Sequence, residues 1–574
     1  MKFYKLDNWR AGFRHDGLLY FSQRIQEMLF YYSDHIYKAP VLNSYLLIRE
    51  YINTADLVRR KIIKENHLKY IMDEFQDTFS KDIILINNIG EDQIKELLQK
   101  INSSSQDDQE KIMIYLLHIL DDYNMWCKTY LKEVVVQEKE KKKIEKALRC
   151  YIPALIDAGY SHEYIYFLNR KIFFETHVDS INVLDDFLDR FDFEEKQYDV
   201  YVAISKEALK FKAILSGRLD VKFKFRFDIS DLKYDADKYK VVKLRIKALD
   251  ERTAASRAYE CLDLFFRYYS FVGEQKANWL FNTGKVVDEC GNIAFVDLCP
   301  NGFDYSVRIG KKAAGEVSDK LISALLSNAR SSFSIIDRAV SIHNTAISES
   351  NMKNGFLNFW SIFEILFVSD QNDSKVLEIE RKALPVLQKD YIHTLVDEIQ
   401  MYISQNIPED NIAEFRKRNA LDADSYWLHK IILLPQYEKA RTALYSVLAD
   451  FPLIRSRIAQ LNESYSKKEN ILKDIERYSK RIEWHLRRLY RTRNAIIHSG
   501  ETPDHLKQLG EHLHSYVDGC LLEIAIALAI KPNLCTIDNV VIDVQMKSEA
   551  TIKHLRKKGS VDEETINILF NPSL

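Results

Sequence analysis

The chain has 574 residues, which is too long for a single hydrophobic core and predicts about three or four domains. Its net charge of −2 excludes a global basic field, so any nucleic-acid binding must use local patches. Seven scattered cysteines without a C-x-x-C pair argue against a zinc cage or a disulfide framework and favour a reducing cytoplasm. The N-terminus lacks an apolar signal core, and the apolar segment 521–530 is too short to span a bilayer. We therefore expect a cytoplasmic protein with no membrane partner.

Residues 1–197 are expected to form a helical N-terminal domain. Apolar residues recur there at intervals of three and four, as in Ile48, Tyr51, Ile52 and Ala55. No motif for chemistry occurs in this region. A helical scaffold is the expected role, and a sensor for a trigger or partner is the alternative.

Residues 198–312 are expected to form a small α+β domain with a mostly antiparallel sheet. The segments 221–229 and 242–248 alternate apolar and basic residues, which predicts two strands with one buried face each. Asp250 is expected to cap a helix that carries an apolar stripe. Three further segments are expected to form strands: 279–287, 293–298 and 303–309.

The wet faces of the first two strands combine six basic residues if the strands are neighbours: Lys222, Lys224, Arg226, Lys243, Arg245 and Lys247. Such a face can follow a phosphate backbone, so Lys224, Arg226 and Arg245 are candidate RNA-binding residues. The alternative is a solvated sheet face whose basic edges discourage aggregation.

Residues 313–535 are expected to form a helical bundle with an insertion near 371–460, and 536–574 a C-terminal extension. The helix 354–368 is apolar nearly all round, which predicts a central position. Glu364 lies in that helix, and a buried carboxylate needs a partner. The predicted fold class is therefore mainly α with a central α+β domain.

A long helix is expected from about 464 to 497. Arg493 falls within its apolar face and also needs an opposite charge, so we predict that Arg493 meets Glu364. Gly500 is expected to end the helix. Four polar residues follow one another at steps of four, three and four, and they are expected to line the outer edge: Arg487, Arg491, Asn494 and His498.

The run from Arg493 to His498 resembles the signature of the HEPN family, which is an Arg followed after four to six residues by a His. Four residues separate the two here, and Asn494 supplies the polar residue that often follows the Arg. With the Ser-Gly after the His and the upstream apolar helix around Trp360, the segment is most similar to the ApeA-like subgroup of bacterial defence proteins. The resemblance covers under half of the chain.

The resemblance implies a HEPN-type helical bundle and a metal-independent endoribonuclease that needs no cofactor. Its cleft would be built from two copies, hence a homodimer acting on RNA. His498 would serve as base or acid when the RNA 2′-OH attacks, and Arg493 would stabilise the phosphate charge, with Glu364 in support. Asn494 would orient the imidazole or the phosphate, and Arg487 and Arg491 would hold flanking phosphates.

An antiviral-defence or toxin effector is the expected biological role. The first 312 residues would then sense a trigger, for example a phage-derived one, or position the substrate. Two alternatives remain open: a non-catalytic protein that binds RNA or nucleotides, and a toxin that a partner protein neutralises. In the simplest structural interpretation, Arg493 is only a core ion pair and His498 only a helix-terminal residue stabilised by the helix dipole.

Overall fold

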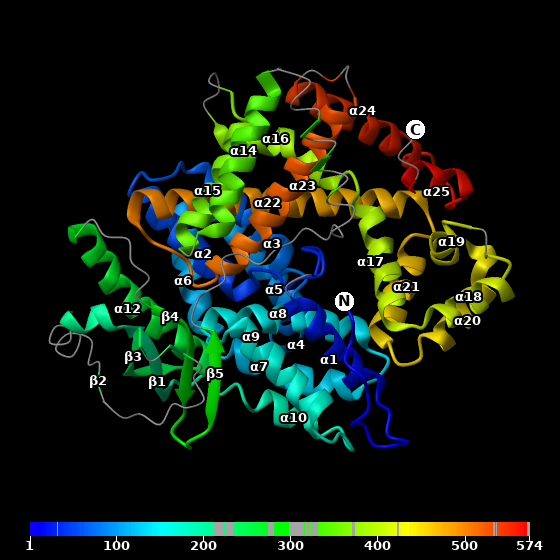
Figure 1. Ribbon diagram of the computed structural model, residues 1–574. Helices are drawn as coiled ribbons and strands as arrows, with labels where there is room; N and C mark the ends of the chain where they lie inside the picture. Colours follow the sequence, from blue (N-terminus) through cyan, green and yellow to red (C-terminus); the bar gives the residue numbers. More distant parts are fainter. Residues whose placement is uncertain are drawn as a thin grey trace.

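The computed structural model describes most of the chain. The described residues are 1–30, 33–211, 222–223, 234–235, 237–273, 280–297, 315, 318–319, 322–323, 331–349, 351–369, 374–421, 424–531, 534 and 536–570. The predicted strand 303–309 and most of the predicted strand 221–229 lie outside these residues, as do Lys224 and Arg226. Helices make up most of the described chain and one small antiparallel sheet accompanies them, which confirms the predicted mainly α class with an α+β part (Figure 1).

The N-terminal part is helical, as its apolar spacing predicts. Ile48, Tyr51 and Ala55 are all buried, and Asn43 caps their helix by accepting a hydrogen bond from the backbone N–H of Leu46 at 2.9 Å. The helices are α1 (Asp16–Leu29), α2 (Ser44–Arg59), α3 (Asn66–Phe79), α4 (Ile83–Asn88), α5 (Glu91–Ser103), α6 (Gln106–Ile119), α7 (Tyr123–Val136), α8 (Lys141–Ala158), α9 (His162–Arg170), the π-helix η1 (Lys171–Glu175) and α10 (Val183–Leu188).

The sheet has the strand order β2-β3-β1-β4-β5, and each neighbouring pair is antiparallel. Its strands are β1 (Lys196–Ser205), β2 (Lys222–Phe223), β3 (Tyr239–Ala248), β4 (Leu280–Val287) and β5 (Ile293–Asp297), and the 3-10 helix η2 (Lys206–Phe211) follows β1. The central strand β1 was not among the predicted strands. It pairs with β3 from Lys196 opposite Ala248 to Ser205 opposite Tyr239.

Helix α12 (Glu251–Gly273) covers one face of the sheet and closes a separate apolar core. Val200, Leu244 and Ala258 belong to this core, so the predicted alternation of β3 is confirmed. Asp250 caps α12 as predicted, because its Oδ1 accepts hydrogen bonds from the backbone N–H groups of the second and third residues of the helix, each at 2.8 Å. Ser161 also donates its backbone N–H to Asp250, which ties the sheet to the N-terminal helices.

The C-terminal part is again helical. Its elements are α14 (Ser331–Ser348), α15 (Met352–Phe367), α16 (Lys375–Gln388), α17 (Tyr391–Asn406), α18 (Glu409–Arg418), α19 (Trp427–Leu433), the 3-10 helix η3 (Pro435–Tyr437), α20 (Glu438–Val447), α21 (Pro452–Ser464), α22 (Lys468–Ser499), α23 (Leu506–Ile530), α24 (Ile537–Leu555) and α25 (Glu563–Phe570). Helices α15, α16, α22 and α23 pack together. Helix α16 thus lies in this group although the sequence analysis assigned it to the insertion.

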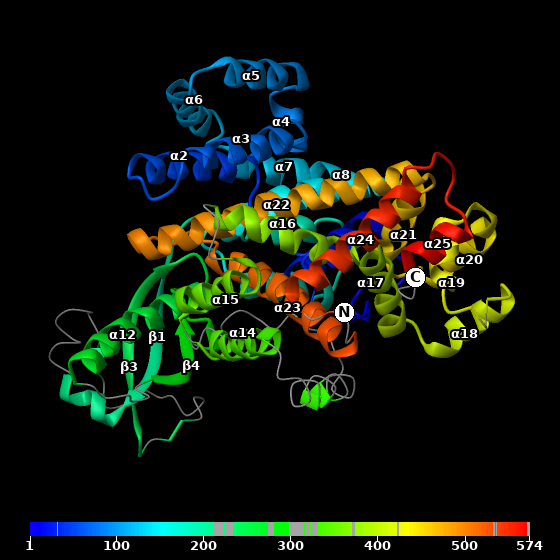
Figure 2. The ribbon, with the colours of Figure 1, turned by 90° about the horizontal axis from the view of Figure 1, so that it is seen from above.

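One apolar core runs through both helical parts of the chain. It includes Phe75 of α3 and Tyr151 of α8 together with Trp360 of α15 and Leu489 of α22. Figure 2 shows why: α22 lies between the N-terminal helices on one side and α15, α16, α23 and α24 on the other. The proposed domain boundaries stay a prediction, but α22 is the element on which both helical parts pack.

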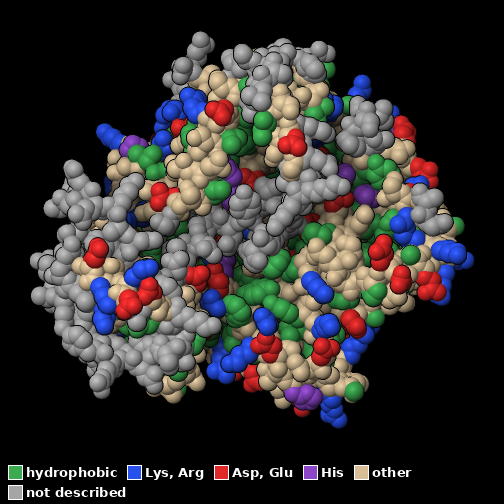
Figure 3. Space-filling view, in the orientation of Figure 1, with side chains coloured by type: hydrophobic (Ala, Val, Ile, Leu, Met, Phe, Trp, Pro, Cys, Tyr) green, Lys and Arg blue, Asp and Glu red, His purple; other side chains and the backbone are tan. Residues whose placement is uncertain are grey.

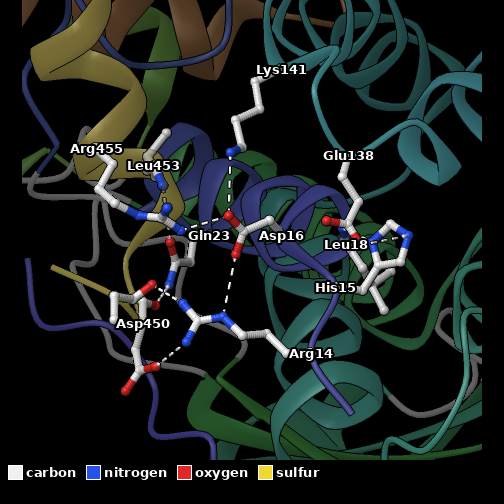
Figure 4. A network of polar contacts seen from close by, with 11 residues as sticks. Arg14, His15, Asp16, Leu18, Gln23, Glu138, Lys141, Asp450, Leu453 and Arg455 are labelled. Atoms are coloured by element: carbon white, nitrogen blue, oxygen red, sulfur yellow. Dashed lines mark hydrogen bonds and ion pairs between the residues drawn. The ribbon is translucent and has the colours of Figure 1, made fainter. Parts of the chain in front are cut away.

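Helix α1 is clamped between α8 and α21 by a polar network (Figure 4). Asp16 in its first turn accepts a hydrogen bond from Arg455 of α21 at 2.7 Å and lies 3.5 Å from the ammonium group of Lys141 of α8. Gln23, two turns further along, donates to the backbone carbonyl of Asp450 at 2.9 Å. The N-terminal helix is therefore fixed to segments more than 400 residues away in sequence.

Helix α23 is long and apolar enough to cross a membrane, and it is longer than the apolar segment that the sequence analysis considered. Most of its most apolar stretch is buried inside the molecule, where Leu513, Val517 and Ile524 belong to the core. This burial is what a core helix of a soluble protein shows. A cytoplasmic location stays a prediction.

Candidate functional site

The candidate site lies at the C-terminal end of α22. Gly500 follows the helix with φ +72°, a left-handed conformation that glycine adopts without steric cost, and its N–H bonds to the carbonyl of Ile496 at 3.1 Å. The predicted helix end is confirmed. Lys353 at the start of α15 donates to the carbonyl of Gly500 at 3.1 Å, so this helix end is attached to α15.

The predicted meeting of Arg493 and Glu364 is confirmed. Arg493 Nη2 lies 3.5 Å from Glu364 Oε1, and Trp360 donates its indole N–H to the same oxygen at 3.2 Å. The two charged side chains are 22% and 21% exposed, so they lie at the edge of the core and not inside it as the sequence analysis expected. The guanidinium is therefore held in place while part of it stays accessible.

Asn494 holds the guanidinium from the other side. Its Oδ1 accepts a hydrogen bond from Arg493 Nη1 at 3.0 Å, and the residue is only 5% exposed. The prediction that Asn494 lines an outer edge with His498 is therefore wrong. In this arrangement Asn494 contacts Arg493 and not the imidazole.

The outer-edge prediction is also wrong for Arg487 and Arg491. Arg487 donates to both oxygens of Glu380 of α16 at 2.8 and 2.7 Å, and Arg491, only 4% exposed, donates to Glu50 of α2 at 2.6 Å. The two carboxylates belong to α16 and α2, which pack against α22. The arginines that were expected on an exposed edge therefore form ion pairs between helices.

Arg488 lies at the centre of this interior face, and the sequence analysis did not single it out. It donates to Glu50 at 3.0 Å and to Glu74 of α3 at 2.5 Å. Burial alone would raise the pKa of Glu50, but Arg488 and Arg491 lower it to about 2. Glu50 is therefore a fixed negative charge that binds α2 to α22.

His498 is exposed at the end of α22 and makes no hydrogen bond or salt bridge with any residue that the structure describes. Ile497 beside it is 47% exposed. The last turn of α22 thus projects beyond the core. It presents an imidazole and an apolar side chain to solvent.

The predicted basic sheet face is only partly described. Lys222 of β2 pairs with Lys243 of β3, so the two predicted strands are neighbours as assumed. Lys243 forms an ion pair with Asp199 of β1, and Arg245 lies 3.3 Å from the same carboxylate. Asp199 therefore offsets part of the positive charge. The roles of Arg245, Lys224 and Arg226 in RNA binding stay predictions.

The described surface carries charges of both signs. Figure 3 shows Lys and Arg side chains interspersed with Asp and Glu over the described part of one face, in keeping with the net charge of −2. Attraction of RNA would depend on local features such as the end of α22.

Two groups of side chains in the described part of the chain have the composition of metal ligands. His343, His514 and Asp518 lie together between α14 and α23, and His554, Asp562 and Glu564 near the C-terminus. In the first group, His343 Nε2 is 2.7 Å and His514 Nε2 3.3 Å from the Asp518 carboxylate. These contacts link α14 to α23, which explains why the three side chains lie together.

No family model, no curated protein and no solved structure matches this chain. The class that the fold and the site define is a mainly helical protein with a small antiparallel sheet, in which Arg493 and an exposed His498 lie in the last turns of α22.

Proposed function

We propose that the chain is a metal-independent endoribonuclease of the HEPN type, with Arg493 and His498 as its catalytic residues. The observation that carries the proposal is the end of α22, where Glu364 and Asn494 hold Arg493 and an exposed His498 follows five residues further along the helix. An antiviral-defence or toxin effector is the role that we propose for such an activity.

Cleavage by this site would use the RNA's own 2′-OH. The His498 imidazole removes the 2′-OH proton, the 2′ oxygen attacks phosphorus, and the bond from phosphorus to the 5′ oxygen breaks. An imidazolium donates a proton to the leaving 5′ oxygen. The products are a 2′,3′-cyclic phosphate and a 5′-hydroxyl. The guanidinium of Arg493 stabilises the charge on the crowded phosphate with its planar set of donors.

The acid and the base must be two different groups, and each chain carries one HEPN signature. We therefore propose a homodimer in which the second copy supplies the other imidazole. The exposed Ile497 supports this arrangement, because an apolar side chain beside the catalytic histidine is suited to burial against a partner. Measurement of the molar mass in solution checks it, and the expected value is twice the 67.4 kDa of the chain.

The test compares the wild-type protein with His498→Ala on total cellular RNA in EDTA. We expect the variant to lose cleavage by about 10²- to 10⁴-fold, the usual contribution of general acid–base catalysis. Because His498 is exposed and makes no hydrogen bond or ion pair with a described residue, the thermal unfolding of the variant should match that of the wild type. His118→Ala is the matched control, since His118 is an exposed histidine on α6. Full cleavage by His498→Ala, or cleavage that stops in EDTA, would refute the proposal.

A further inference from the structure

A cavity of about 550 Å³ lies on the opposite half of α22 from His498, between α22 and the helices α1, α8, α17 and α21. Six basic side chains line it: Arg24, Arg149, Arg457, Lys473, Arg477 and Arg481. The acidic side chains in its lining are Glu145 and Asp474, so positive charge is in excess.

Two of the arginines are balanced by carboxylates. Arg24 donates to both oxygens of Glu145 at 2.6 and 2.9 Å and to Glu27 at 2.9 Å, and Arg457 donates to Glu27 at 2.9 Å. Two arginines and two glutamates thus form a compact network in the wall. The charges of these two arginines and two glutamates balance one another.

Asp474 is also engaged. Its Oδ2 accepts hydrogen bonds from the hydroxyl groups of Tyr391, at 3.1 Å, and of Tyr465, and its Oδ1 lies 3.3 Å from Arg477. The Asp474 carboxylate is therefore engaged by three neighbours, and its charge offsets that of Arg477.

Arg149 and Arg481 have no opposite charge of their own. Arg149 makes no hydrogen bond or salt bridge with the described residues, and Arg481 has no carboxylate within 4.0 Å among them. Arg481 lies over the ring of Tyr478 at 5.8 Å. Burial lowers the pKa of Arg149 to about 10; the Glu145 carboxylate opposes this shift, and repulsion from Arg481 adds to it. An unpaired cation in such surroundings is unfavourable unless an anion joins it.

The positive lining continues beyond this cavity. A second cavity of about 540 Å³ shares Arg149, Arg477 and Arg481 with the first, and it extends along α22 as far as Arg488. The three shared arginines thus stand between two hollows. A ligand bound to them can be longer than one phosphate.

We propose that these arginines bind a small ligand that carries several phosphate groups and has the size of a nucleoside triphosphate. Guanidinium groups bind phosphate oxygens with two parallel hydrogen bonds, which a cluster from α8 and α22 can offer together. The volume lies within the range of roughly 300–1,000 Å³ that small-molecule sites occupy. The site does not depend on the ribonuclease proposal, because it uses different residues.

Occupancy of the site would join the two halves of the helical core. Arg149 belongs to the N-terminal helix α8, whereas Arg477 and Arg481 belong to α22. Arg481 and Arg493 are twelve residues apart on one continuous helix, or about 18 Å at 1.5 Å per residue. The ligand would therefore stabilise the same helix that carries the candidate catalytic end.

Binding of ATP to the full-length protein, measured by calorimetry, tests the proposal, with tripolyphosphate and inorganic phosphate as further probes. We expect saturable ATP binding that weakens at least about tenfold in Arg149→Gln and in Arg481→Gln, since each loses charge-assisted hydrogen bonds. The control Arg418→Gln, on the exposed side of α18, should bind like wild type. Without ligand, Arg149→Gln should unfold at a higher temperature, because repulsion between Arg149 and Arg481 is removed.

If Arg149→Gln or Arg481→Gln does not fold, the double variant Lys473→Gln with Arg477→Gln tests the same site. Both of its residues are exposed, so we expect it to fold. It should also weaken ATP binding at least about tenfold. Tripolyphosphate binding as tight as that of ATP would support the site and assign recognition to the phosphate chain. The proposal is overturned if none of the three probes binds saturably, or if all variants retain wild-type affinity. Binding of single-stranded RNA that depends on Arg149, without ATP binding, would also overturn it.

Discussion

The middle of α22 and its C-terminal end both carry basic residues but differ in what those residues contact. In the middle, Arg487, Arg488 and Arg491 each donate to a carboxylate from another helix. At the end, Arg493 shares one carboxylate with an indole N–H, and His498 has no described partner. The middle therefore joins the helices of the core, whereas the end has donors left for a ligand.

The largest effect expected from the middle is on stability. Arg488→Ala would leave Glu50 and Glu74 without their shared partner, and stranding a buried charge typically costs about 3–5 kcal/mol. Urea unfolding measures the change in the free energy of unfolding. Arg418→Ala, which breaks an exposed pair with Glu414, should change it by only about 0.5 kcal/mol. A cost below about 1 kcal/mol for Arg488→Ala would show that the clamp is not what holds α2 and α3 to α22.

The matched comparison between Arg493 and Arg491 tests the end of the helix against the middle. We expect Arg493→Ala to lower RNA cleavage about 10²- to 10³-fold, the usual loss when a transition-state donor is removed. It should change stability by no more than about 1 kcal/mol, because the pair with Glu364 is partly exposed. Arg491→Ala should lower the free energy of unfolding, whereas the folded fraction of this variant should cleave RNA like the wild type. Equal cleavage by Arg493→Ala and wild type would remove Arg493 from the site.

Buried histidines should make the helical core sensitive to acid. Burial lowers the pKa of His67 and of His429 to about 4, and that of His512 to about 3, from the ordinary value of 6.5. These folded-state pKa values lie below the unfolded value of 6.5. The contribution of the neutral histidines to the free energy of unfolding is therefore complete above pH 6.5 and is lost as the pH falls. At pH 5 each of these histidines would lower the free energy of unfolding by on the order of 2 kcal/mol relative to neutral pH.

Urea unfolding at pH 7 and pH 5 measures this acid sensitivity. His429→Gln is a useful partner variant, because it removes one titrating group and should show a smaller difference between the two pH values. Unchanged stability of the wild type at pH 5 would contradict the account.

The smallest effect is expected at Glu364, which we regard as a positioning residue. Glu364→Gln keeps an acceptor for the indole N–H of Trp360 but removes the charge opposite Arg493. We expect a loss of cleavage of about three- to tenfold, seen in kcat more than in KM, and less than about 1 kcal/mol in stability. Restoration of the wild-type rate by Glu364→Asp would support a charge requirement. A loss as large as that of Arg493→Ala would instead indicate direct catalysis.

Local features of the fold were predictable from the sequence because neighbouring residues determine them. The alternation in β3, the Asp250 cap and the helix end at Gly500 each follow from a few adjacent residues. The missed strand β1 carried the same signal, since Tyr198, Val200 and Val202 alternate and are all buried. Strand β1 was therefore predictable from its own residues, like β3.

The faces of α22 were not predictable, because distant residues determine them. Arg487 and Arg491 look like an exposed polar stripe until Glu380, 107 residues away, and Glu50, 441 residues away, are placed beside them. The cavity lined by Arg149 and Arg481 was not predictable for the same reason, since these two residues come from α8 and α22. By contrast, the contact between Glu364 and Arg493 was predicted because each helix carried one charge of opposite sign on its apolar side.

The measurement that tests the central claim most directly is the chemistry of the RNA ends that the purified protein creates in EDTA. New 5′-hydroxyl ends can be labelled by a polynucleotide kinase without prior removal of phosphate. We predict that the wild-type protein generates such ends on total cellular RNA, that His498→Ala does not, and that RNA with 2′-O-methyl groups stays intact. New ends that carry a 5′-phosphate, cleavage of the methylated RNA, or no cleavage of either RNA would contradict the account.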